Sequence, residues 1–209
     1  MAASRIDGVT NQRKVTMSSI NTTAQDLTFL ERDFWNRVAA FHGHECPGLA
    51  IGYKACEAVI AEFGLSRTAL PVIDEELVCI TENDACCVDA IQSLLGCTYG
   101  KSNLICRLRG KMAFSFYTRE SGKALRLYLK PNLGQGMTRD EFKTYLLDTP
   151  YTELFEIGAP RWPLPEPARL FNSECCSVCG ESTAEYALRI HEGKPICLDC
   201  YDAYDREGF

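Results

Sequence analysis

Two pairs of cysteines near the C-terminus restrict the fold of that part of the chain more than any other feature of the sequence. Cys176 and Cys179 form one Cys-x-x-Cys pair, Cys197 and Cys200 form a second, and seventeen residues separate the pairs. This spacing is typical of a structural zinc site in which each pair supplies two thiolates to one tetrahedral ion. About 35 residues cannot bury enough apolar surface to fold unaided, so we expect the ion to stabilise this tail.

Two neighbouring side chains compete for a role in the same site. Cys175 precedes Cys176, but only Cys176 keeps the two-residue gap to Cys179, so we assign the site to Cys176. His191 lies between the two pairs, and we interpret it as a surface residue. The tail carries basic residues together with several acids, which gives only weak support to nucleic acid as a partner.

Composition indicates a folded protein without a secretory or membrane segment. Hydrophobic residues make up 46% of the 209 residues, and the net charge is −6, so no overall basic field calls for nucleic acid. No apolar run approaches the ~18 residues of a membrane span, and the N-terminus lacks the apolar region of a signal peptide. Twelve cysteines in such a chain indicate reduced thiols and metal sites rather than disulfides. We therefore expect a cytoplasmic protein.

A second group of potential metal ligands lies in the stretch Phe41-His42-Gly43-His44-Glu45-Cys46-Pro47-Gly48. His42, His44 and Cys46 occupy alternate positions, so in an extended loop their side chains would point the same way. Imidazole nitrogen and thiolate sulfur suit zinc or another borderline transition metal. The alternative is a helix–helix turn with incidental histidines. The density of ligand types favours the metal site.

Helices are predicted on both sides of this loop. Apolar residues recur at three- and four-residue steps over 24–41, as on one face of a helix. These residues are Leu27, Leu30, Phe34, Val38 and Phe41. A second helix is predicted over 49–63, with Gly64 as its C-cap. Gly48 and Gly52 are small, so another segment can approach the start of this helix closely.

The segment after the second helix predicts a buried strand over 77–81 that turns into a helix within 82–92. Asp84 is the candidate N-cap of that helix. Cys86 and Cys87 would lie in its first turn, where the helix dipole lowers the pKa of a thiol. Adjacent residues on a helix diverge by about 100°, so only one of these two thiols can point at a given site.

The remaining sequence predicts more strands, a closing helix and a linker. A strand is expected over 103–108, a hairpin over 112–119 and 124–130, and a helix that opens with a capping box at 138–141. A short helical turn is expected at 151–155. The fold class is thus α+β, with a helix pair packed on a mixed β-sheet, followed by a small C-terminal zinc ribbon of treble-cysteine type.

Four prolines within 160–167 indicate a semi-rigid linker. We therefore expect a flexible tail over 1–23, a core domain over 24–158, the linker over 159–172 and the zinc ribbon over 173–209.

Several of these stretches together resemble the FmdE family, named for the E subunit of formylmethanofuran dehydrogenase. They are F-H-G-H-E-C-P-G at 41–48, G-Y-K-A at 52–55, N-D-A-C-C-V-D-A-I-Q at 83–92 and G-C-T-Y-G-K at 96–101. The resemblance covers about residues 30–155, plus the ribbon, and implies association with a larger molybdenum- or tungsten-dependent enzyme of one-carbon chemistry. On the family's pattern the cysteine two positions before V-D-A-I is Cys86. Cys87 departs from the pattern, because a small residue is usual there.

The first functional hypothesis is a metal ion, most simply zinc, in the core. It would be held by His42 or His44 together with Cys46 and Cys86, with one position open to water or to a small molecule. Such an ion can polarise a carbonyl or activate water. Glu45 or Asp89 could serve as acid, base or hydrogen-bond partner of a histidine. For Asp89 we favour a plain charge at a helix start, and the residues leave open whether the core is an enzyme.

Two other hypotheses remain. Cys46 and Cys86 could form a reversible disulfide, although the core has no Cys-x-x-Cys pair. Alternatively, the ribbon docks onto a protein partner and the core senses a metal or a metabolite without catalysis. We also expect a homodimer, because the linker would let the ribbon reach a neighbouring subunit.

Overall fold

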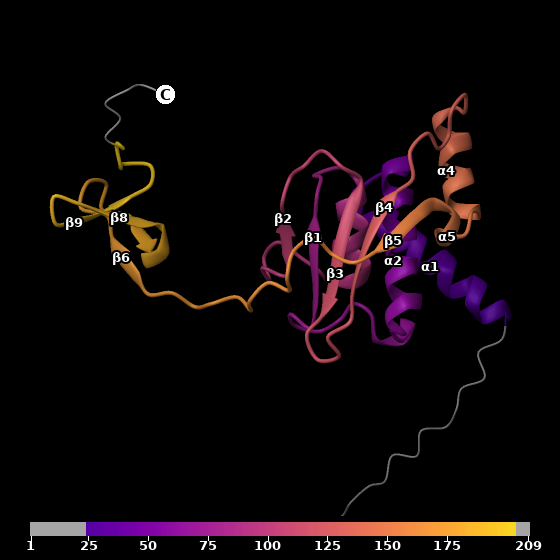
Figure 1. Cartoon of the computed structure of the whole chain (residues 1–209), viewed down its shortest axis with the longest axis horizontal. Coiled ribbons are helices and arrows are strands. Elements are labelled where there is room, and N and C mark those ends of the chain that lie inside the picture. Colours follow the sequence, from indigo (N-terminus) through magenta and orange to yellow (C-terminus); the bar gives the residue numbers. More distant parts are fainter. Residues whose placement is uncertain (1–23, 204–209) are drawn as a thin grey trace, which may run out of the picture.

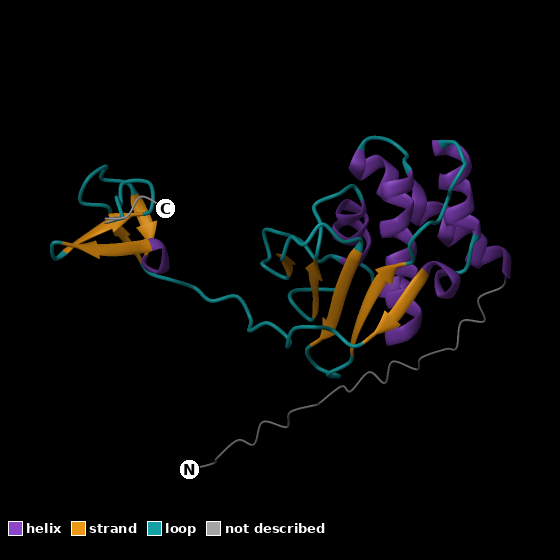
Figure 2. Cartoon of the chain, turned by 45° about the horizontal axis from the view of Figure 1, so that its top comes forward, coloured by secondary structure: helices purple, strands orange, loops and turns teal. Residues whose placement is uncertain are grey.

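The computed structural model of the chain describes residues 24–203, so the predicted flexible tail at 1–23 lies outside the described residues. A mixed sheet with helices on one face forms the larger part, and a small module of short hairpins follows it (Figures 1 and 2). This arrangement confirms the α+β prediction. The boundaries proposed between core, linker and ribbon stay predictions. Among the described residues, none of the helices has the length and apolar character that a bilayer crossing requires.

The sheet has five strands in the order β2-β1-β3-β4-β5. β1 pairs in parallel with β2, and the other neighbouring pairs are antiparallel. The sequence predicted every strand except β5, of which only Phe155 is buried. The strands are β1 (Leu77–Thr81), β2 (Leu104–Cys106), β3 (Ala113–Thr118), β4 (Ala124–Leu129) and β5 (Phe155–Gly158).

The helices gather on one face of the sheet (Figure 2). The predicted helix within 82–92 is in fact a short α-helix, α3, that continues as a π-helical turn, η2. The elements are α1 (Ala24–His42), α2 (Pro47–Phe63), the 3₁₀ turn η1 (Arg67–Ala69), α3 (Cys87–Ala90), η2 (Ile91–Leu95), α4 (Arg139–Asp148) and α5 (Tyr151–Leu154).

Helix α2 is the centre of the core. Pro47 occupies its first turn, where no backbone donor is needed, and Gly64 ends it with a left-handed φ of 70°, as predicted. Most of its side chains are buried, because α1, α3 and α4 pack around it. A Cβ on Gly52 would lie 2.1 Å from the carbonyl oxygen of Cys87, so the predicted close approach is confirmed and the approaching element is α3.

The predicted apolar stripe of α1 is correct in part. Phe34 and Val38 are buried, whereas Phe41 is 57% exposed. The stripe continues at the four-residue step to His42, whose side chain is 11% exposed, and this turns Phe41 to the outside. The side chains of Leu27 and Leu30 lie outside the described residues.

The proline-rich segment is not a free connection over its whole length. Trp162 packs with Val78, Ile80 and Tyr117 on the face of the sheet away from the helices, and the Tyr117 hydroxyl donates to the Trp162 carbonyl at 2.7 Å. Further along, Arg119 donates to the Pro165 carbonyl at 2.9 Å. We call residues 160–168 the docked linker (Figure 1).

The C-terminal module consists of two hairpins. β6 (Ser173–Cys175) pairs with β7 (Ser182–Ala184), the 3₁₀ turn η3 (Glu185–Ala187) follows, and β8 (Leu188–His191) pairs with β9 (Lys194–Cys197). Among the described residues of this module, only Cys176, Ile196 and Cys197 form a buried apolar cluster. Such a small core agrees with the need for an ion to hold the module together.

Candidate metal centres

The core site lies where α1 ends and α2 begins. His42 is the last residue of α1, and Gly43 turns the chain with a φ of 87°. Cys46 is extended (φ −153°, ψ 164°) and caps α2, with its sulfur accepting from the Leu49 amide at 3.3 Å. The expectation of a fully extended loop is therefore wrong, because its first ligand belongs to a helix. The helix end and the glycine turn bring the side chains together instead.

Three potential ligands meet at this corner. The ligand atoms of His42, His44 and Cys46 lie within 4.8 Å of one another. Cys46 Sγ is 4.0 Å from His42 Nε2, and the centroids of the two imidazole rings are 4.5 Å apart. Cys46 is buried and His44 is exposed, so the group opens toward solvent on one side. The structure thus brings both histidines together, where the sequence offered one or the other.

Cys86 lies beside Cys46 but is not part of the group that includes both histidines. A Cβ on Gly48 would lie 3.7 Å from Cys86 Sγ and 3.8 Å from Cys46 Sγ. Burial raises the pKa of Cys86, and the neighbouring Cys46 thiol raises it further. The expected lowering of its pKa is wrong, because α3 has only four residues and contributes little dipole.

Cys87 points away from the cavity, into the core. Its sulfur donates to Asn83 Oδ1 at 3.1 Å, and burial raises its pKa to about 12. The expectation that Asp84 caps the following helix is also wrong. The position before α3 is Cys86, and the turn is held by Asn83, whose side chain accepts from the Ala85 amide at 3.1 Å. Asp84 is left exposed at the rim.

The two candidate acids have different surroundings. Asp89 does stand at the start of α3, but its carboxylate Oδ2 lies 2.7 Å from His42 Nδ1, so the plain helix-start interpretation is wrong. The Glu45 carboxylate accepts from Lys143 at 2.8 Å and from Trp35 at 3.1 Å, and these bonds lower its pKa. Asp89 is thus the acid that contacts a potential ligand.

A cavity of about 400 Å³ adjoins this corner. Its lining includes His42, Asp84, Cys86, Asp89, Gln92 and Cys106. The charged groups among its lining residues are carboxylates, and neither lysine nor arginine lines it. The sequence did not single out Cys106. Its position at the end of β2, paired in parallel with the end of β1, could have indicated it, because parallel strands open such crevices at their carboxyl ends.

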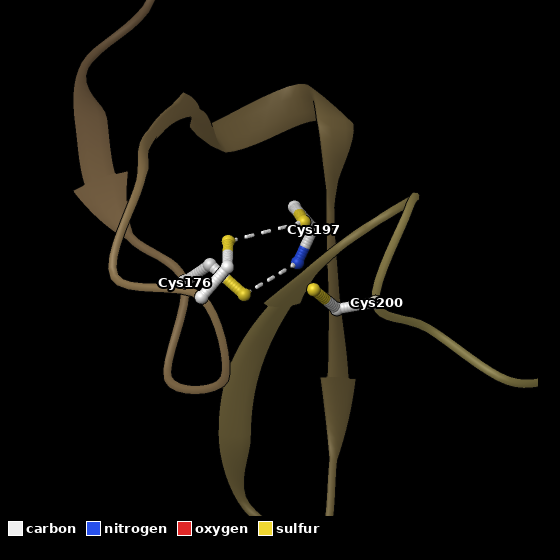
Figure 3. Close-up of side chains that lie close together, drawn as sticks. Cys176, Cys197 and Cys200 are labelled. Atoms are coloured by element: carbon white, nitrogen blue, oxygen red, sulfur yellow. Dashed lines mark hydrogen bonds between the residues drawn. The ribbon is translucent and has the colours of Figure 1, made fainter.

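The four predicted cysteines of the tail come together in the C-terminal module. The sulfurs of Cys176, Cys179, Cys197 and Cys200 lie within 4.8 Å of one another, so the cluster can hold a metal ion. Figure 3 shows the labelled side chains of this cluster pointing toward one another. Hydrogen bonds from the backbone amides of Cys179, Cys197 and Val178 lower the pKa of Cys176 to about 6. These amides favour a thiolate, which is the form that binds metals.

The two competing residues of the tail lie outside this cluster. Cys175 is exposed, and the His191 ring is also exposed and contacts Tyr201, with 6.0 Å between the ring centroids.

Comparison with known proteins gives a family and a fold. The family described as "FmdE, Molybdenum formylmethanofuran dehydrogenase operon" matches residues 41–153. A curated relative from Archaeoglobus fulgidus, named a probable S-adenosyl-L-methionine-binding protein, is 25% identical over 196 residues, which cover 80% of this chain. They cover 52% of the relative, so the chain spans about half the length of this relative.

A solved structure shares the fold. It is an FmdE-like protein of the tungsten formylmethanofuran dehydrogenase type from Syntrophus aciditrophicus, with a TM-score of 0.53 and 22% identity. The match covers 81% of this chain and 91% of that one. The family match extends over more than half of the chain and includes the histidine–cysteine corner and the α3 segment, so this chain belongs to the FmdE family.

Proposed function

We propose that the core binds a transition metal ion, zinc, at the corner of His42, His44 and Cys46, and uses it to hold a small polar molecule in the adjoining cavity. The observation that carries this proposal is the convergence of three ligand atoms within 4.8 Å beside a cavity of about 400 Å³. The fourth position faces Cys86 or the bound molecule. The four tail cysteines hold a second, structural zinc ion.

The donor set fits such an ion. Two imidazoles and one thiolate are ligands that zinc prefers, and three protein ligands with one open position are typical of catalytic rather than structural zinc. The 4.0 Å between Cys46 Sγ and His42 Nε2 is close to the ~3.6 Å expected for a sulfur and a nitrogen on one tetrahedral zinc ion. When bound, the ion would supply a Lewis acid toward a carbonyl or a water molecule.

Counting metal ions in variants of the full chain tests this proposal. We expect two zinc ions per wild-type chain, one in Cys46→Ser, and two in the matched control Cys106→Ser, which removes another thiol of the same cavity. Cys197→Ser should lose the tail ion and unfold only the tail. Elemental analysis after gel filtration measures these numbers. If Cys46→Ser retains both ions, the core site does not exist as proposed.

A second candidate function is binding of S-adenosyl-L-methionine in the same cavity. The curated relative's name suggests it, and the lining favours it, since Asp84 and Asp89 are carboxylates and the ligand carries a positively charged sulfonium. Calorimetric titration should show tighter binding of this ligand than of S-adenosylhomocysteine, which lacks the charge. Equal affinities, or no binding of either, would exclude a cavity selective for the sulfonium.

For partners, we propose a homodimer that associates with a larger molybdenum or tungsten enzyme. Support comes from the exposed apolar side chains of the tail, since such groups on a small module favour protein contacts. They include Leu170, Phe171, Val178, Tyr186, Ile190 and Leu198. Light scattering of the full chain measures the oligomeric state directly, and a monomeric mass would remove the homodimer.

A further inference from the structure

Four groups form a continuous line of hydrogen bonds that ends on His42. The Tyr99 amide donates to Gln92 Oε1 at 3.4 Å, and Gln92 Nε2 donates to Asp89 Oδ1 at 3.3 Å. The other Asp89 oxygen, Oδ2, lies 2.7 Å from His42 Nδ1. Asp89 is thus held by one oxygen and holds the imidazole with the other.

This arrangement determines which ring nitrogen of His42 is available. A carboxylate at 2.7 Å from Nδ1 keeps the proton on Nδ1, because the carboxylate can only accept. Nε2 then carries the free lone pair, and it is the nitrogen that faces Cys46 Sγ. The second oxygen of Asp89 is fixed by Gln92, so the ring plane is fixed as well.

The chain segment around these residues is built to place them. Asp89 is on α3 and Gln92 is in the π-helical turn η2, and such wide turns are frequent at functional sites. The close contact of α3 with Gly52 sets the distance between the Asp89 carboxylate and the end of α1. A salt bridge made only for stability would not need the backbone of Tyr99 as a further anchor.

We propose that Asp89, anchored by Gln92, is a positioning residue of the core metal site: it orients His42 and keeps its Nε2 unprotonated toward the ion. This inference rests on the proposed metal site but is separate from it, because the site could bind its ion without help from Asp89. Hydrogen-bond partners of metal-bound histidines typically contribute 10- to 100-fold to metal affinity.

The test compares Asp89→Asn with Asp84→Asn in the full chain. Both variants remove one negative charge from the lining of the same cavity, but only Asp89 contacts His42. Competition with a chromophoric chelator gives the zinc affinity of the core, and the visible spectrum of bound Co²⁺ reports its coordination. We expect Asp89→Asn to weaken binding roughly 10- to 100-fold and to alter the spectrum, while Asp84→Asn stays within about twofold of wild type. Gln92→Leu should give a smaller loss than Asp89→Asn.

The outcomes separate the two proposals. Equal affinities and spectra for the two asparagine variants would overturn the role of Asp89 and leave the metal site standing. Failure of the wild-type core to bind a second ion would overturn the metal site itself. The melting temperature of the metal-free variants excludes a merely structural role, because a positioning residue leaves that temperature equal to the Asp84→Asn value.

Discussion

At Gly52 a missing side chain decides where the thiols of α3 stand. A Cβ at this position would lie 2.1 Å from the Cys87 carbonyl oxygen and 2.7 Å from its carbon, so backbone atoms block any larger residue. The sequence indicated a close approach at this glycine but not its partner. Spacing within one helix says nothing about which distant segment packs against it.

Gly52→Ala should therefore destabilise the core, although alanine is the better helix former. We expect the free energy of unfolding to fall by about 1–3 kcal/mol from overpacking, measured by urea denaturation. The control is Gly100→Ala, whose Cβ would meet no described atom within 4 Å, and which should change the value by less than about 0.5 kcal/mol. Equal stabilities of the two variants would contradict the tight contact.

Residue-level chemistry was easier to predict than residue-level direction. The ligand types of His42, His44 and Cys46 are visible in the sequence, and their proximity follows from short spacing alone. The contact of Asp89 with His42 joins residues 47 positions apart, and the position of Cys106 depends on strand pairing. Neither has a local pattern, so neither could be read before the fold was known.

At the scale of elements, the strongest local patterns gave correct predictions. The β3–β4 hairpin and the capped start of α4 follow from alternation and from a capping box. Strand β5 was missed because Glu156, Ile157 and Gly158 are exposed, which leaves no alternation to detect. The π-helical turn η2 was missed because its extra residue per turn has no sequence signature there.

The capping box of α4 provides a prediction on stability and pH. The Thr138 amide donates to Glu141 Oε2 at 2.7 Å, and the hydrogen bonds from Thr138 lower the pKa of Glu141. Thr138→Ala should cost about 1 kcal/mol of unfolding free energy at neutral pH. Because a lowered pKa stabilises only the ionised state, the part due to Glu141 is present above its ordinary pKa of 4.5 and disappears as the pH falls through the lowered value.

Urea denaturation of Thr138→Ala between pH 7 and pH 3 measures this cost. Thr144→Ala, at an exposed position within the same helix, is the control and should be neutral or slightly stabilising. A cost that is independent of pH would show that the Glu141 carboxylate contributes nothing to the cap.

At the scale of the whole molecule, the twelve cysteines divide into classes by their surroundings. Cys106 and Cys175 are exposed and should react with a thiol reagent in the native protein. Removal of metal by a chelator should add Cys86 and the tail ligands. The four core thiols Cys56, Cys79, Cys87 and Cys97 should react only after unfolding, because burial raises the pKa of each.

Mass spectrometry after timed alkylation assigns each cysteine to its class. The decisive comparison is the reactivity of the tail cysteines with and without a chelator, since thiolates on an ion are protected. Rapid alkylation of Cys176 and Cys197 in the metal-loaded protein would contradict a four-thiolate site in the tail.

The docked linker also limits how far the tail can travel. Because the Ala168 amide donates to the Glu75 carboxylate at 3.0 Å, only residues 169–172 separate this anchor from β6. Four extended residues span roughly 14 Å. Any molecule captured by the tail is thus presented beside the outer face of the sheet at an effective concentration of about millimolar. A weak second contact with that face would then be enough to retain a partner that neither surface could hold alone.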